Sequence, residues 1–333
     1  MRNKARVAKL ATILMMGLMF SVFLLDILTV LLFNHYEKRY PVAAADTAFI
    51  GTDGSRIHFL NTGNSDAILL ESDGHFALVD SGWGSENPNL KARRQGYERS
   101  VIEYLKKVAL RNGTVTLDFV LLTHYHYDHA GGFPAIFSDP AIRVGQAFFR
   151  SLEAQEYAYE HSSWQMEEIF NLVNDAAAAA GVPVRRQLPA EPFQFGAMRL
   201  QLFNTDSYDD AKLKGENDNS VVTLVTVNGS RVLLTGDTTA MHGLEKKLAE
   251  AVGQIDLLKL CHHGYAMSNS IPFLRGVKPK LAIVTNGLGQ VYPNVKWNLV
   301  MNARCPYYST VRENGIIAAF GENGRITLSG NLM

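Results

Sequence analysis

A short stretch in the first half of the chain concentrates side chains that bind metal ions. His124, His126, Asp128 and His129 fall within six consecutive positions and follow the apolar run 117–122. Imidazole nitrogens and carboxylate oxygens are common protein ligands of zinc and similar divalent ions. A buried strand that ends in this pattern would present the four side chains together at the edge of a sheet. The spacing therefore predicts a metal site, in preference to a surface loop that is histidine-rich by chance.

Three further apolar runs end in an acid or a histidine with a glycine beside it. They end at Asp80, at Asp237 and at the pair His262 and His263. In layered α/β folds, strand ends that gather on one edge of a sheet form the binding sites. Asp80 can serve as a carboxylate behind metal-bound histidines or as a turn-forming residue. We expect these residues to meet the histidine-rich stretch at one edge of a sheet.

The turn residues and the apolar periodicity predict the elements that carry these side chains. Asn228-Gly229 is the clearest hairpin signal, and Ser72-Asp73-Gly74 predicts a second hairpin. Amphipathic or capped stretches predict helices at 99–111, 133–137, 153–180 and about 240–252. Strands are predicted at 56–60, 67–71, 75–80, 117–122, 143–149, 198–203, 221–227, 231–235, 255–261, 280–285 and 314–320.

Composition limits the class of protein. The 333 residues are 47% hydrophobic, which is enough for one large domain or two smaller ones. Lys plus Arg equals Asp plus Glu at 32 each, so no global basic charge points to a nucleic-acid partner. The two cysteines, Cys261 and Cys305, exclude a disulfide-rich scaffold.

The N-terminal segment has the pattern of a membrane anchor. Four basic residues lie in 1–9, and 10–33 is apolar except for two threonines, one serine and one aspartate. A helix of this length can cross a bilayer, and the positive-inside rule places 1–9 in the cytoplasm. We therefore predict a cytoplasmic basic tail at 1–9, a transmembrane anchor at 10–33, a linker at 34–46 and an extracytoplasmic domain at 47–333.

Two features of this segment leave alternatives. Asp26 would cost roughly a few kcal/mol at mid-membrane, which a proton or a partner helix could offset. Ala43-Ala44-Ala45 fits the small-residue pattern of signal-peptide cleavage, so a secreted chain is the alternative to a single-pass membrane protein. The apolar run is longer than the core of a typical signal peptide, which favours an uncleaved anchor.

The motifs, taken in chain order, resemble those of the metallo-β-lactamase superfamily from about residue 47 to the C-terminus. Within it the chain resembles the soluble hydrolase domain of ComEC-type competence (DNA-uptake) proteins, and phosphorylcholine esterases of cell-wall teichoic acid are similar at several points. The resemblance implies an α/β fold, a four-layer αββα sandwich that follows one N-terminal transmembrane helix. The motifs that carry it are Asp80-Ser81-Gly82, His124-x-His126-x-Asp128-His129, Thr235-Gly236-Asp237 and His262-His263-Gly264, with 59–67, 216–220, Lys259 and 308–310.

The resemblance implies two divalent metal ions, zinc or manganese, and assigns their ligands. The first would be held by His124 and His126, the second by Asp128, His129 and His263, with Asp237 bridging the two. His262 would face the substrate, although it is the alternative to His263 as the ligand. Asp80 would support the metal-bound histidines from behind.

The chain departs from the superfamily pattern at Asn219-Ser220, where many members place a metal-binding histidine. The first metal would then keep two imidazoles and Asp237, so we expect a weaker or more open first site. ComEC-type proteins share this departure. Asn219 and Ser220 are expected to lie beside the metal ions rather than to bind them.

These features predict a metal-dependent hydrolase that uses a metal-bound hydroxide, with Asp128 and His262 as catalytic residues. A phosphodiester, in DNA or in a phosphorylated wall polymer, is the expected substrate. The alternatives are a hydrolase of lactones, β-lactams or phosphorylcholine esters, and an anchored binding subunit without catalysis. The membrane is the expected partner through the N-terminal helix, and the sequence indicates no protein partner.

Overall fold

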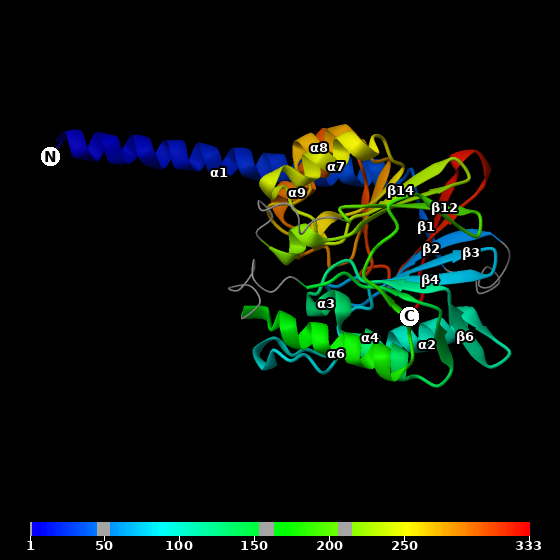
Figure 1. The fold of residues 1–333 in the computed structure, drawn as a ribbon. Coiled ribbons are helices and arrows are strands. Elements are labelled where there is room, and N and C mark those ends of the chain that lie inside the picture. The colour runs from blue at the N-terminus through cyan, green and yellow to red at the C-terminus, as the bar shows by residue number, and fades with distance from the viewer. Residues whose placement is uncertain (1, 45–53, 153–162, 206–214) are drawn as a thin grey trace.

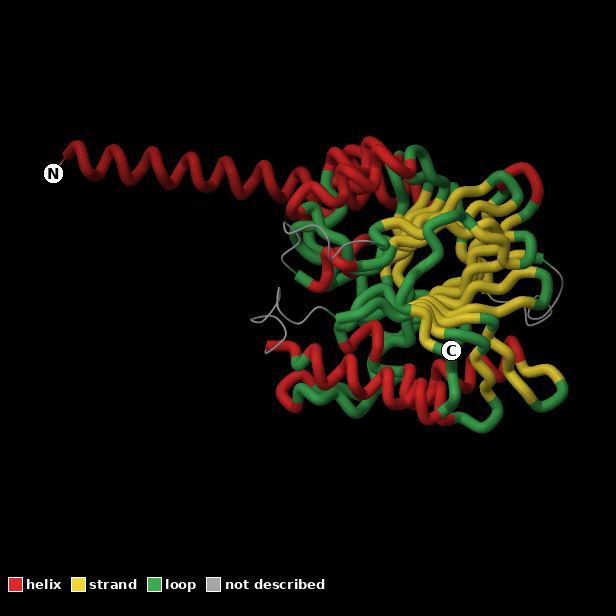
Figure 2. The backbone as a smooth tube through the Cα atoms, in the orientation of Figure 1, coloured by secondary structure: helices red, strands yellow, loops and turns green. Residues whose placement is uncertain are grey.

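The computed structural model describes residues 2–44, 54–152, 163–205 and 215–333. Two large mixed sheets face each other, and helices cover the outer face of each (Figure 1). In Figure 2 the strands form the inner layers and the helices lie outside them. This arrangement confirms the four-layer αββα sandwich expected from the sequence.

The first sheet contains nine strands, and the hairpin predicted at Ser72-Asp73-Gly74 joins two of them. In spatial order they are β1 (Val42–Ala44), β19 (Ile326–Gly330), β18 (Ile316–Phe320), β2 (Ser55–Phe59), β3 (Ile68–Ser72), β4 (His75–Val79), β7 (Phe119–Leu121), β9 (Ala147–Phe148) and β10 (Val184–Arg185).

The second sheet contains seven strands, and a small third sheet lies outside the sandwich. The Asn228-Gly229 hairpin joins two strands of the second sheet, as predicted. Its strands are β11 (Phe193–Phe195), β12 (Met198–Phe203), β13 (Val222–Val227), β14 (Ser230–Leu234), β15 (Leu257–Lys259), β16 (Leu281–Val284) and β17 (Tyr307–Ser309). The third sheet is β5 (Leu110–Arg111), β6 (Thr114–Leu117) and β8 (Ile142–Val144).

Buried apolar side chains fill the three spaces between the layers. One cluster lies between the two large sheets, one between the first sheet and helices α2, α4 and α6, and one between the second sheet and helices α7 and α8. The helices are α1 (Arg2–Glu37), α2 (Glu98–Ala109), α3 (Tyr127–Ala130), α4 (Phe133–Ser138), α6 (Met166–Ala179), α7 (Leu244–Val252), α8 (Ile271–Val277), α9 (Pro293–Trp297) and the π-helix η7 (Asn298–Ala303). Short 3-10 turns are η2 (Leu90–Ala92), η4 (Glu216–Asn219), η5 (Met241–Gly243), η6 (Cys261–Gly264) and η8 (Glu322–Gly324).

Two of the predicted strands are each broken into two shorter ones. The run 117–122 divides at Asp118, so that β6 joins the third sheet and β7 the first. The run 143–149 divides at Gly145 in the same way, giving β8 and β9. The two breaks lie against each other, because a Cβ on Gly145 would come within 2.6 Å of the Asp118 carbonyl oxygen. Glycine permits this close approach, and the chain changes sheets here.

The N-terminal region is more structured than the predicted linker at 34–46. Helix α1 continues to Glu37, and Val42–Ala44 forms a strand parallel to β19. The segment Arg6–Glu37 is long and apolar enough to cross a membrane. Of the helix predicted at 153–180, residues 153–162 lie outside the described residues, and α6 begins at Met166.

Candidate metal centre

The candidate site lies where strands of both large sheets end. Strands β4 and β7 run parallel, and the chain continues from them into Asp80 and, through a short turn, into α3. Strands β14 and β15 also run parallel and continue into Asp237 and into η6. Parallel strands end on the same edge of a sheet, so the residues that follow them converge. Helix α3 brings Asp128 and His129 to this edge.

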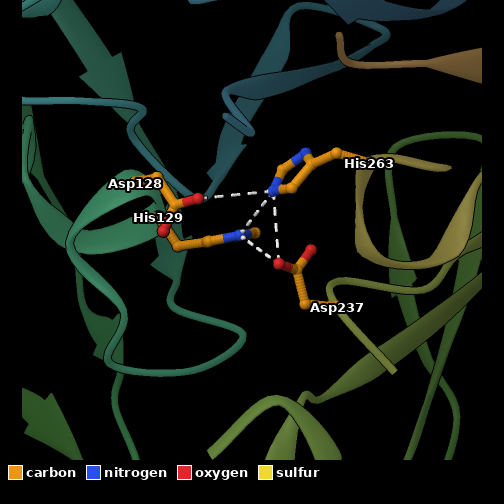
Figure 3. Close-up of side chains that lie close together, drawn as sticks. All are labelled: Asp128, His129, Asp237 and His263. Carbon is orange, nitrogen blue, oxygen red and sulfur yellow. Dashed lines mark hydrogen bonds and ion pairs between the residues drawn. The ribbon is translucent and has the colours of Figure 1, made fainter. Parts of the chain in front are cut away.

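Four of the predicted ligands meet at one point (Figure 3). Nε2 of His263 lies 3.2 Å from Nε2 of His129 and 3.2 Å from Oδ2 of Asp237. Nε2 of His129 lies 3.3 Å from the same Asp237 oxygen, and Asp128 Oδ2 lies 3.5 Å from Nε2 of His263. We call Asp128, His129, Asp237 and His263 the four-donor cluster. All its ligand atoms lie within 4.8 Å of one another, so they could share one metal ion.

Hydrogen bonds on the outer side of each imidazole orient the cluster. Nδ1 of His129 donates to Oδ2 of Asp80 at 2.7 Å, and Asp80 also accepts two bonds of 2.8 Å from the backbone and hydroxyl of Thr123. Nδ1 of His263 lies 3.0 Å from the hydroxyl of Thr285. When the outer nitrogen of a neutral imidazole holds the proton, the inner nitrogen presents a lone pair. The donor set therefore fits a divalent cation.

The electrostatics of the cluster favour positive charge. Burial alone would lower the pKa of His263, but Asp237 and Asp66 outweigh it and raise that pKa to about 9. Burial also opposes the charged form of His129, yet Asp237, Asp80 and Asp128 hold its pKa well above the usual value. Protons or a cation can therefore neutralise the buried carboxylates, and a metal would have to displace the protons.

Two charged residues beneath the four-donor cluster, Lys259 and Asp66, were given no role from the sequence. Lys259 lies in the apolar strand β15 with 0% of its side chain exposed. Its ammonium pairs with the carboxylate of Asp66, donates to the Gly236 carbonyl at 2.9 Å, and lies 3.6 Å from Oδ1 of Asp237. Asp66 Oδ1 lies 3.4 Å from Nδ1 of His263. A lysine within an apolar strand is the signal that could have revealed this group, because a buried ammonium needs a carboxylate partner.

His124 and His126, expected to hold the first metal, lie beside the four-donor cluster. Nε2 of His124 is 3.1 Å from Nδ1 of His126, and the ring centroids of His124 and His129 are 4.2 Å apart. Among the described residues, neither His124 nor His126 belongs to a group of three mutually close donors. Burial and neighbouring histidines hold the pKa of His124 well below its usual value, so its imidazole is neutral. The structure thus gathers the expected second site but not a three-donor first site.

The loop at Asn219-Ser220 supports the site from outside the cluster. Ser220 Oγ accepts a hydrogen bond of 2.9 Å from the backbone N–H of Asp237 and lies 3.4 Å from Nδ1 of His124. Asn219 donates to Oε2 of Glu216 at 2.9 Å. Both residues are buried, and both hold neighbouring segments in position.

A cleft of about 480 Å³ opens over the cluster, and His262 lies on its wall. The side chain of His262 is 25% exposed, and its Nε2 lies 3.9 Å from Oδ2 of Asp237 and 3.3 Å from Nδ2 of Asn217. Burial lowers the pKa of His262. His262 and His263 both have positive φ, at 49° and 48°, which turns the two consecutive imidazoles in different directions. His263 enters the cluster and His262 faces the cleft.

Aromatic and basic side chains form the outer part of the cleft. The Arg94 guanidinium lies 4.9 Å from the ring centroid of Trp83 and donates to Oδ1 of Asn64 at 3.0 Å. The amide of Asn64 donates in turn to the hydroxyl of Tyr265 at 3.1 Å. Lys91 and Trp164 also line the cleft.

The first part of this site is similar to a known protein family. Residues 60–145 match the sequence profile of the metallo-beta-lactamase superfamily. The chain is 26% identical over 284 residues to recombination protein 2 of Haemophilus influenzae, covering 85% of this chain and 27% of that protein. It is 28% identical over 184 residues to competence protein ComA of Neisseria gonorrhoeae, covering 54% of this chain and 21% of that protein. It is 21% identical over 257 residues to ComE operon protein 3 of Bacillus subtilis, covering 75% of this chain and 28% of that protein. The chain thus spans about a quarter of the length of these relatives.

Solved structures show the same likeness at low identity. The metallo-beta-lactamase fold protein YhfI of Bacillus subtilis is 11% identical, with a TM-score of 0.48, covering 83% of this chain and 100% of that one. Zinc-bound PqqB of Methylobacterium extorquens is 15% identical, with a TM-score of 0.42, covering 73% of this chain and 85% of that one.

Proposed function

Because residues 60–145 match the metallo-beta-lactamase superfamily and the chain has that fold, we propose that it is a metal-dependent hydrolase that cleaves phosphodiester bonds outside the cytoplasmic membrane. The observation that carries the proposal is the four-donor cluster at the floor of the cleft. Two nitrogens and two carboxylates in this geometry suit zinc or manganese.

A divalent ion held by this cluster would supply Lewis-acid polarisation of the scissile group and would acidify a water molecule. Asp128 is the most exposed of the four donors, with 18% of its side chain accessible, so its carboxylate can also orient a water or hold a proton on the cleft side. His262 is kept neutral by burial and faces the cleft, where it can accept a proton or bind a substrate oxygen. Its partner Asn217 limits the rotation of its ring.

The position of His124 and His126 supports one well-held ion and a weaker second one. One ion in the four-donor cluster accounts for the most tightly grouped donors. A second ion, held by His124 and His126 with Asp237, would bind more weakly, because Asn219 stands where many superfamily members have a third imidazole.

The cleft wall supports a substrate with phosphates and flat rings. Arg94 and Lys91 provide positive charge, whereas Trp164 and Tyr265 provide aromatic surface. Single-stranded nucleic acids bind to grooves of this kind, where phosphates meet cations and bases stack on aromatic rings. We favour DNA over a phosphorylated wall polymer for this reason, since a wall polymer offers phosphates without bases.

The N-terminal segment supports a location outside the membrane. The basic flank precedes the apolar helix, which by the positive-inside rule leaves the flank in the cytoplasm and the domain outside. Secretion after cleavage near Ala43-Ala44-Ala45 is the alternative, and the mass of the chain isolated from membranes distinguishes the two.

A second candidate is a binding subunit without turnover. The observation that favours it is Asn219, whose amide is bonded to Glu216 and not to the histidine pair. Lactone, β-lactam and phosphorylcholine-ester hydrolysis remain further alternatives, and nitrocefin and nitrophenyl phosphorylcholine test them directly.

The experiment uses the full chain purified in detergent and loaded with Mn²⁺ or Zn²⁺. We expect cleavage of bis-p-nitrophenyl phosphate and of single-stranded DNA, and loss of both activities in Asp128→Ala. Asp139→Ala is the matched control, since Asp139 pairs with Lys106 away from the cleft. A wild-type chain that binds metal but cleaves no ester would refute the hydrolase, and retained DNA binding in the same preparation would establish the binding subunit.

A further inference from the structure

The last turns of helix α1 are bound to the domain. Oδ1 of Asp26 accepts a hydrogen bond of 3.1 Å from the indole N–H of Trp297, at the end of α9. The ring centroid of Phe33 lies 4.7 Å from that of Tyr307, and Tyr36 is buried in the apolar cluster beneath α7 and α8. The face that contains positions 26, 29, 33 and 36 therefore packs on the domain.

Polar contacts fix the end of the helix to the second sheet. The backbone carbonyl of Glu37 accepts a bond of 3.1 Å from the hydroxyl of Tyr308, and its carboxylate pairs with Arg312 at 3.2 Å. Helix and domain thus form one continuous packed unit from Asp26 onward.

The opposite face of the same turns is apolar and exposed. Its side chains remain 42–61% exposed, and they are Ile27, Leu28, Val30 and Leu31. A helix whose one face packs on protein and whose other face exposes four large apolar side chains needs an apolar covering.

The length of α1 decides where a bilayer would lie. The last basic residue before the apolar run is Lys9, so a span from Leu10 to Leu31 measures roughly 33 Å, close to the roughly 30 Å of hydrocarbon. A span that stopped before Asp26 would measure only roughly 24 Å and would leave the four apolar side chains in water. Asp26 and Trp297 therefore lie roughly 8 Å inside the Leu31 end of that span. Trp297 belongs to the domain, so this part of the domain surface must lie at the same depth.

We propose that the surface formed by Tyr292, α9 and η7 sits in the interfacial layer of the lipid bilayer crossed by α1. Its residues suit that layer. Tyr292 is 46% exposed, and Trp297 is half-buried with its N–H on Asp26. Tyrosine and tryptophan favour the membrane interface, and Lys296 can extend its ammonium to the headgroups. Asp26 is thereby satisfied by the domain rather than by a second helix.

This placement brings the cleft to the membrane surface, a consequence that rests on the proposed function. The backbone N–H of Tyr292 donates to the Gly264 carbonyl at 3.0 Å, and its ring lies 6.0 Å from that of Tyr265, which lines the cleft. Figure 1 shows α1 leaving the domain on the side where α9 and α3 lie, away from β6. A substrate strand that emerged at the membrane would meet the site directly.

An environment-sensitive fluorophore at Tyr292→Cys tests the lipid contact without measuring activity. Both native cysteines are buried, so the introduced thiol reacts selectively. Leu110→Cys is the matched control, because Leu110 is 40% exposed on β5, beside β6 at the far end of the domain. The full chain is reconstituted in nanodiscs with and without lipid that carries a doxyl quencher near the headgroup. We expect the probe at 292 to lose at least half of its emission to the doxyl lipid, and the probe at 110 to lose almost none.

Two results would overturn the proposal. Weak quenching by lipid with strong quenching by aqueous iodide at 292 would place this surface in water. Weak quenching by both would mean that protein, such as a second copy of the chain, covers it. Because hydrolysis is not measured, either result leaves the proposed function intact.

Discussion

Replacing Lys259 with methionine removes the ammonium beneath the metal centre while it keeps most of the apolar stem. The carboxylates of Asp66 and Asp237 would then stay buried without the cation that now lies between them. Removing one partner of a buried ion pair lowers the free energy of unfolding by about 3–5 kcal/mol, because the remaining charge stays buried without water or a counter-ion. A folded domain has only about 5–15 kcal/mol of stability, so the variant would lose a large part of it.

The matched control is Lys280→Met. Lys280 also pairs with an aspartate, Asp256, at 2.7 Å, but 59% of its side chain is exposed. Exposed pairs contribute about 0–1 kcal/mol, so this variant should unfold almost like the wild type. The two variants make the same chemical change, at a buried lysine between two carboxylates and at an exposed lysine beside one.

Urea unfolding of the full chain in detergent, with chelator present, measures the difference. With a slope of about 3 kcal/mol/M, Lys259→Met should lower the midpoint by more than about 1 M, and Lys280→Met by less than about 0.3 M. Added Zn²⁺ should stabilise Lys259→Met more than it stabilises the wild type, because it neutralises the buried negative charge that has lost its ammonium partner. Equal midpoints for the two variants would refute the view that Lys259 balances the buried carboxylates.

Three further changes probe other parts of the structure. Asp80→Asn weakens the hydrogen bond that orients His129, so metal affinity should fall about 10–100-fold in a competition assay with a chelating dye, while the metal stoichiometry at saturation is unchanged. His58 is buried, and burial holds its pKa below the ordinary 6.5 despite Glu71. As the pH falls, the unfolded chain protonates His58 before the folded chain does, so the contribution of His58 to stability should be complete above pH 6.5 and decline below it. His58→Gln should remove this contribution to the fall in unfolding midpoint at low pH. Arg94→Ala should raise KM for single-stranded DNA with little change in kcat, because Arg94 lines the cleft. The slope of log affinity for single-stranded DNA against log salt concentration should fall in magnitude by about 0.7. An unchanged slope would exclude a contact between Arg94 and a phosphate.

The apolar runs and turn signals predicted the strands, whereas their arrangement in a four-layer sandwich was implied by the resemblance to the metallo-β-lactamase superfamily. Asn228-Gly229 and Ser72-Asp73-Gly74 form the hairpins expected of them. The breaks at Asp118 and Gly145 escaped prediction, since the change of sheet depends on a contact between two segments that are distant in sequence.

The sequence indicated which residues could form the site better than it indicated how those residues group around a metal ion. Strand-end motifs indicated that Asp128, His129, Asp237 and His263 could converge, and the structure brings them together. Local spacing also suggested that His124 and His126 hold an ion, but metal binding requires a third donor from another segment, which local spacing does not reveal. Lys259 was noted as part of a motif but was given no role, because a lone cation in an apolar strand reveals its partner only in three dimensions.

The pairing of β1 with β19 has a consequence for the order of assembly. Val42, five residues after the end of α1, lies opposite Leu328, which comes from a distant part of the sequence. Until β19 is in place, the edge of the first sheet nearest α1 lacks its partner. A partly folded chain would therefore expose an unpaired strand edge beside the helix, and only this long-range pairing covers it.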